Sequence, residues 1–237
     1  GRFYLGGTSG NITVDNTDID LNGVNEGFYL RANQTLSIGE DTTIDVVLNE
    51  TEGRYGINFT DVNYTYTVAE TATVNATVYE PVAIAQIGTI KYPTLQGAID
   101  AVKDGETITL LADCAEAVTF TQTKDVSFVL DGNDKTYTGS INITARAGQN
   151  APSTLVIKNF NFETDKTSHD FIKSVETNYY PNNITITGCS FKGTSDINTE
   201  GYAVVAVRLK SANNIKIEYC TGTGLHSFLQ NTAGWDM

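Results

Sequence analysis

The sequence predicts an all-β protein of the solenoid type, a parallel β-helix, and a repeated pattern is the main reason. Residues 153–164, 182–194 and 213–224 read STLVIKNFNFET, NNITITGCSFKGT and NNIKIEYCTGTG. Aligned on Ile157, Ile186 and Ile217, the three segments are 29 and 31 residues apart. Alternating apolar residues indicate a strand with one inward face. A nearly constant period indicates that each repeat adds one such strand to a stack.

The alignment also predicts which side chains stack inside the protein. We expect Leu155, Ile184 and Ile215 to form one inward ladder and the three aligned isoleucines to form the next. A shift of one residue would turn every member outward, so this register is strict. Cys189 and Cys220 occupy equivalent places in successive repeats, about 4.8 Å apart if the strands are parallel. That distance permits a disulfide, but we expect free buried thiols.

Residues 1–81 show a related but weaker repeat. The segments NITVDNTDIDLN, QTLSIGEDTTIDVVLN and NYTYTVAETATVNATV each pair one alternating strand with a second strand that begins five or six residues later. Periods of this length favour coils of a β-helix. An immunoglobulin-like sandwich is the alternative for this region.

Between the two repeat regions lies the one segment with a helical period. In YPTLQGAIDAVKDGE, apolar residues recur at the spacing of one helix face, which predicts a short capping helix near residues 94–103. Thr94 can cap its start and Gly105 can take a left-handed conformation after its end. We therefore expect a linker and capping helix over 82–112, and a β-helix over 113–237 that is truncated at its C-terminus.

Composition excludes several classes of function. Among 237 residues, 28 acids against 15 bases give a net charge of -13, which opposes binding to nucleic acid or to an anionic membrane. No segment is long and apolar enough to predict direct membrane insertion. Three Cys, two His and one Met offer few ligands, so no metal or cofactor is expected.

The segments YPTLQGAIDAVKDGETITLLAD and VSFVLDGNDKTYTG, followed by the NIxIxxCxF repeats, resemble the pectate-lyase-like right-handed parallel β-helix superfamily. The likeness covers residues 82–230 well and 1–81 poorly. Within that superfamily, the chain resembles in particular the non-catalytic, adhesin-type modules of large cell-surface proteins. The resemblance implies an architecture, and it does not imply a reaction.

Catalytic members of that superfamily provide a test of enzymatic function. Pectate lyases hold calcium with clustered Asp residues beside an Arg, whereas the acids here are scattered. Polygalacturonases need paired carboxylates, and this chain has TGTG at the corresponding place. The remaining candidates are Glu200, Arg208, Lys210 and His226. We expect no catalytic site.

Eight Asn-x-Thr sequons are compatible with a glycosylated, extracellular and cell-surface associated protein. They begin at Asn11, Asn33, Asn49, Asn58, Asn63, Asn75, Asn142 and Asn183. The sequence thus favours a structural or adhesive module that acts as a rigid spacer and binding surface for a cell-surface or host glycan or protein. A carbohydrate-active β-helix is the alternative. Because apolar residues continue to the end of the chain, head-to-tail self-association is a further possibility.

Overall fold

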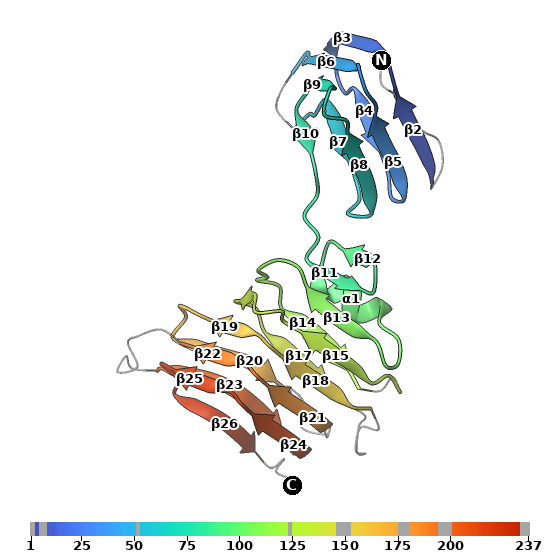
Figure 1. Ribbon diagram of the computed structural model, residues 1–237. Helices are drawn as coiled ribbons and strands as arrows, with labels where there is room; N and C mark the ends of the chain where they lie inside the picture. The colour runs from blue at the N-terminus through green and yellow to red at the C-terminus, as the bar shows by residue number, and fades with distance from the viewer. Residues whose placement is uncertain are drawn as a thin grey trace. The chain divides into compact units, whose positions relative to one another are not determined.

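The computed structural model describes residues 3–4, 9–50, 53–122, 125–145, 153–174, 181–193 and 201–232 (Figure 1). In these ranges the chain is all-β apart from one short helix, and parallel sheets dominate, so the predicted all-β class is confirmed. The chain divides into two compact units, Gly1–Val82 (unit 1) and Ala83–Met237 (unit 2).

The described strands of unit 1 form three parallel sheets, and each sheet takes every third strand of the chain. The sheets contain β1 (Phe3–Tyr4), β4 (Phe28–Leu30), β7 (Ile57–Phe59) and β10 (Val78–Tyr79); β2 (Gly10–Val14), β5 (Gln34–Ile38) and β8 (Tyr64–Val68); and β3 (Asp18–Val24), β6 (Thr43–Leu48) and β9 (Thr73–Asn75). Every pairing among them is parallel. The sheets of an immunoglobulin-like sandwich are antiparallel, so unit 1 departs from that alternative.

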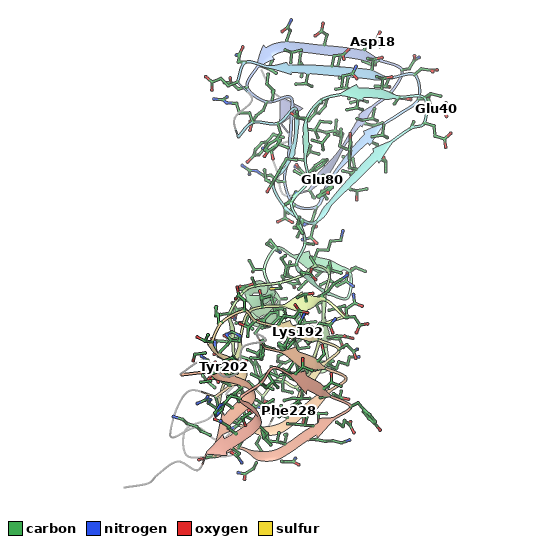
Figure 2. All side chains as sticks on the ribbon, turned by 90° about the vertical axis from the view of Figure 1, so that its left-hand side faces the viewer. Asp18, Glu40, Glu80, Lys192, Tyr202 and Phe228 are labelled. Atoms are coloured by element: carbon green, nitrogen blue, oxygen red, sulfur yellow. The ribbon has the colours of Figure 1, made fainter. Side chains whose placement is uncertain are left out.

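Alternation along these strands sends one set of side chains into the interior of unit 1. Phe28 lies opposite Ile57, and both are fully buried. The polar residues that alternate with the apolar residues along these strands face away from the core, and Asp18 and Glu40 point outward in Figure 2. Apolar residues at every second position of short strands thus produce a narrow core with an acidic exterior.

Unit 2 also contains three sheets in its described part, and they are longer. The sheets contain β12 (Ile90–Tyr92), β11 (Ala85–Ile87), β13 (Thr107–Leu110), β15 (Phe128–Asp131), β18 (Leu155–Lys158), β21 (Asn182–Thr187) and β24 (Asn213–Glu218); β14 (Val118–Thr121), β17 (Ile141–Thr144), β20 (Ser168–Lys173), β23 (Ala203–Lys210) and β26 (Ser227–Thr232); and β16 (Thr136–Tyr137), β19 (Asn161–Glu163), β22 (Ser190–Lys192) and β25 (Thr221–Thr223). Pairings among β13 and the strands that follow it in the chain are all parallel.

The predicted inward ladders are confirmed by the register of β18, β21 and β24. Leu155 lies opposite Ile184, which lies opposite Ile215. The aligned isoleucines Ile157, Ile186 and Ile217 stack in the same way. The first two members of each ladder are buried and the third is half-buried.

Aromatic rings fill the rest of the interior of unit 2. The rings of Phe162 and Phe191 stack with their centroids 4.7 Å apart, and Phe160 stacks on Phe162 at 5.1 Å. The ring of Tyr137 meets both Phe160 and Phe162 edge to face. Stacked strands place equivalent rings one above another, which is why the Phe positions repeat with the same period as the isoleucines.

The helix α1 (Leu95–Ala101) forms within the predicted segment. Thr94 is its N-cap, and its hydroxyl accepts a hydrogen bond of 3.1 Å from the backbone N–H of Gly97. Gly105 takes the expected left-handed conformation, with φ of 79°. The sequence predicts only linker and helix over 82–112, but the structure also places β11, β12 and β13 there.

These added strands and α1 together protect the first edge of the sheets of unit 2. The hairpin of β11 and β12 pairs antiparallel with β13, which satisfies the edge of the first sheet. The side-chain amide of Gln96 on α1 donates to the Thr119 carbonyl and accepts from the Thr119 N–H of β14, at 3.1 and 2.8 Å. A side chain thereby takes the place of a neighbouring strand, which is one way in which proteins shield an edge.

Candidate functional site

The candidates named from sequence do not form one site. Glu200 lies outside the described residues. Arg208 is on β23, where its Nε forms an ion pair of 2.9 Å with Asp170 of β20. Lys210 is two residues further along the same strand.

His226 is exposed and lies just before β26, with its backbone N–H bonded to the Val204 carbonyl. Val204 is four residues from Arg208 on one strand, so the backbones of the two candidates are about 13 Å apart. The ion pair of Arg208 and Asp170 links neighbouring strands. This ion pair could not be predicted from the sequence, because the partners are 38 residues apart.

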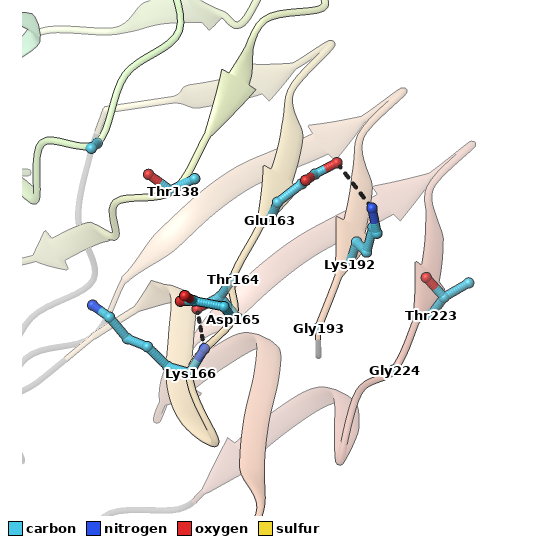
Figure 3. A pocket seen from close by; sticks show the side chains of 10 residues that line it. Thr138, Glu163, Thr164, Asp165, Lys166, Lys192, Gly193, Thr223 and Gly224 are labelled. Carbon is cyan, nitrogen blue, oxygen red and sulfur yellow. Dashed lines mark hydrogen bonds and ion pairs between the residues drawn. The ribbon is translucent and has the colours of Figure 1, made fainter. Parts of the chain in front are cut away.

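One hollow in the described part of unit 2 is an open groove of about 860 Å³ (Figure 3). It crosses the ends of β16, β19, β22 and β25, the four strands of one sheet. Four neighbouring strands span about 14 Å. The lining residues are Ala115, Thr138, Glu163, Thr164, Asp165, Lys166, Lys192, Gly193, Thr223 and Gly224.

One wall of the groove is a row of side chains at equivalent positions of successive strands. Glu163 lies opposite Lys192, and Lys192 lies opposite Thr223. The Lys192 ammonium and the Glu163 carboxylate are 3.6 Å apart (Figure 3). The row thus carries a carboxylate, an ammonium and hydroxyls, groups that can donate and accept hydrogen bonds along the stack.

A turn after β19 contributes the other charged groups. Asp165 and Lys166 are both exposed, and the Lys166 backbone N–H donates to the Thr164 hydroxyl at 3.2 Å. This short turn fixes the backbone of the two charged residues beside the row on β19 and β22. The arrangement can hold a polar ligand through groups of both charges.

Two glycines line the groove at the turns that follow β22 and β25. Gly193 and Gly224 occupy the turns that follow β22 and β25, and a Cβ on Gly193 would overlap the Gly224 carbonyl oxygen and the Tyr202 hydroxyl. The Tyr202 hydroxyl donates to that same carbonyl. The close approach of two turns therefore requires glycine at position 193.

Sequence reasoning missed the groove, although the signal was present. Glu163 directly follows Phe162, and Lys192 and Thr223 stand at the equivalent positions of the next two repeats. The alignment of the repeats could therefore have placed these three side chains in one outward row. In the sequence alone, Asp165 and Asp170 read as acids that flank a loop. The structure separates those two acids, because one lines the groove and the other pairs with Arg208.

The sequons differ in how accessible their amides are. Asn11, Asn33 and Asn49 are exposed, whereas the Asn142 side-chain oxygen is buried and has no hydrogen-bond partner among the described residues. The Asn183 side chain accepts a hydrogen bond from Asn214. The remaining three lie in unit 1, where the Asn63 amide bonds to Asp61 and the Asn75 amide to Asp45.

Comparison of the chain with protein-family models, with curated proteins and with solved structures found no match. In the part of the chain that the structure describes, no helix is long and apolar enough to cross a membrane.

Proposed function

We propose that the chain is a right-handed parallel β-helix module of the pectate-lyase-like type that serves a secreted or cell-surface protein as a rigid spacer and binding surface. The pairing of every third strand within parallel sheets supports the architecture, because winding a chain around three faces produces that order. Parallel crossovers are right-handed in about 98% of known cases, which favours the handedness. The capped first edge of unit 2 suits an extended stack that stays soluble.

The ligand of this module is a glycan, and the groove across β16, β19, β22 and β25 is its binding site. The observation that carries the proposal is the row of Thr138, Glu163, Lys192 and Thr223 along an open groove about 14 Å long. A saccharide presents hydroxyls that both donate and accept, and these four side chains do the same. The exposed sequons of unit 1 fit a protein that passes through a secretory route.

A glycan array with the full chain tests this function. We expect retention of at least one saccharide, and we expect Lys192→Ala to weaken its binding about tenfold or more, since the variant removes the ammonium that donates hydrogen bonds in the row. Lys216→Ala is the matched control, because Lys216 is exposed on β24 of another sheet. Equal binding by Lys192→Ala and Lys216→Ala would place the site elsewhere, and an array without any retained saccharide would refute the glycan ligand.

The alternative, a carbohydrate-active enzyme, is favoured by the two carboxylates in the groove. Glu163 and Asp165 are the kind of pair that glycoside hydrolysis uses. We nevertheless propose binding without turnover, because the Glu163 carboxylate is already engaged in an ion pair of 3.6 Å with Lys192. Release of reducing sugar that is lost in Glu163→Gln or Asp165→Asn would establish the enzyme instead. Loss in Glu200→Ala or His226→Ala would do so through the other candidates.

A further inference from the structure

Two of the three cysteines of unit 2 lie next to each other in space. Thr187 is paired with Glu218, and Ser190 is paired with Thr221. Cys189 and Cys220 fall at the same position between these two registered pairs, in the turns that follow β21 and β24. The Thr221 backbone N–H donates to the Cys189 carbonyl at 3.0 Å, so the two backbones are in direct contact at the cysteines.

The side chains of both cysteines point to the same side of the stack. The Cys189 thiol lies 3.9 Å from the Ile157 carbonyl, and the Cys220 thiol lies 3.7 Å from the Ile186 carbonyl, the equivalent group one repeat later. Cys220 is also close enough to be one of the causes that raise the pKa of the Cys189 thiol. Neighbouring parallel strands are about 4.8 Å apart, within the Cα separation of roughly 4.4–6.8 Å that a disulfide spans.

We propose that Cys189 and Cys220 form an intrachain disulfide when the folded protein meets a small disulfide oxidant such as oxidised glutathione. The bond joins two successive repeats of unit 2 and closes a loop of 31 residues. The inference is independent of the glycan site, because neither cysteine lines the groove. It differs from the expectation of permanently free thiols, which is the state that the structure shows.

The reaction proceeds by two thiol–disulfide exchanges. The Cys220 thiolate attacks one sulfur of oxidised glutathione, which breaks the glutathione disulfide and releases one glutathione thiolate. The Cys189 thiol then gives its proton to water, and its sulfur attacks Cys220 Sγ, which releases the second glutathione thiolate. Two cysteine thiols lose two electrons in total, and one glutathione disulfide gains them.

Exposure and acidity determine the order of these steps. Cys189 is 2% exposed, whereas Cys220 is half-buried, so the oxidant reaches Cys220 first. Burial, as the largest cause, and the neighbouring Cys220 raise the pKa of the Cys189 thiol to about 12. The second step therefore depends on a rare thiolate, and we expect it to be the slow step and to accelerate as the pH rises.

Peptide mapping by mass spectrometry after incubation of the full chain with oxidised glutathione at pH 8 tests the proposal. We expect a cross-linked peptide that contains Cys189 and Cys220, the loss of two free thiols, and a thermal midpoint of unit 2 that rises by roughly 5–15 °C. Cys114→Ala is the matched control, since Cys114 precedes β14 and should not affect the cross-link.

Three outcomes would overturn the proposal. In the first, Cys189 is still alkylated when the protein is unfolded after incubation with oxidised glutathione. In the second, Cys220 retains glutathione as a stable mixed disulfide. In the third, the cross-linked peptide contains Cys114. The Cys220→Ser variant tests whether the reaction requires Cys220, because it should retain both remaining thiols under the same conditions. Since the principal measurement uses the natural sequence, a variant that folds poorly does not affect the result.

Discussion

At the residue scale, glycine is required where two turns that line the groove approach each other. Gly193 is buried where its backbone approaches Gly224 and Tyr202. An alternating pattern identifies strands, but it does not show which turn residue faces a neighbouring turn. For this reason the inward ladders could be predicted from residues such as Ile186, whereas the need for glycine at 193 could not.

Replacement of Gly193 by alanine tests this close approach. The added methyl must displace the Gly224 carbonyl or the Tyr202 hydroxyl, so we expect the free energy of unfolding to fall by about 1–3 kcal/mol. Thr223→Ala changes an exposed neighbour in the same groove and should alter stability by about 0.5 kcal/mol or less. Urea unfolding of both variants measures the difference, and equal stabilities would show that the turns can separate without cost.

His169 provides a second test at this scale. The structure places His169 on β20, half-buried, with Nε2 3.0 Å from the Gly139 carbonyl and its ring against Phe171. Burial is the main cause that lowers the pKa of His169 below its usual value of 6.5; the nearby charges of Lys166, Lys173 and Asp170 modify it further. The neutral ring is therefore part of the folded state.

A depressed pKa makes the stabilisation from His169 depend on pH. The contribution is complete above pH 6.5, and it declines as the pH falls from 6.5 toward the lower pKa of the folded protein, since the unfolded chain takes up the proton first. We expect His169→Gln, which stays neutral, to lose less stability than the natural chain between pH 7 and pH 5. Urea unfolding at both pH values decides this, and parallel losses in the two proteins would assign the decline to other groups.

At the element scale, strand order follows from the repeat, but edge protection does not. Three aligned isoleucines suffice to predict parallel strands and their register. The hairpin of β11 and β12 was not predicted, because Ala85–Ile87 and Ile90–Tyr92 are too short to give a clear alternating pattern. The bonds from Gln96 to Thr119 are also invisible in sequence, since they depend on where α1 comes to lie.

The role of Gln96 as a substitute for an edge strand can be measured. Gln96→Met keeps the length of the side chain and removes both hydrogen bonds to Thr119, which are exposed, so we expect unit 2 to lose about 0.5–1.5 kcal/mol of stability. Lys103→Met, an exposed residue just after α1, is the control, and it should be nearly neutral. Hydrogen exchange at the Thr119 amide should accelerate in Gln96→Met alone. Unchanged protection of that amide would mean that another group satisfies the edge.

At the scale of the whole molecule, the residues that the structure describes form two cores that share no member. The buried core of unit 1 runs from Val14 to Phe59, and that of unit 2 runs from Ala85 to Ala212. Sequence could suggest this division because the repeat changes near residue 82 and the helical period begins soon after. The groove was beyond such reasoning, since it joins residues from Ala115 to Gly224 that only the stacking of strands brings together.

Separate cores lead us to expect that the two units unfold as separate cooperative transitions. Two cores unfold in one transition when the loss of one core removes contacts of the other. Among the described residues, none belongs to both cores. Phe59→Ala deletes a fully buried ring of unit 1, and Phe162→Ala deletes one of unit 2. Each costs about 3–5 kcal/mol. Scanning calorimetry of the full chain should therefore show two transitions, with Phe59→Ala lowering one midpoint by roughly 10 °C or more and Phe162→Ala lowering only the other. If both midpoints moved together in either variant, the cores would be coupled and the chain would unfold as one cooperative structure.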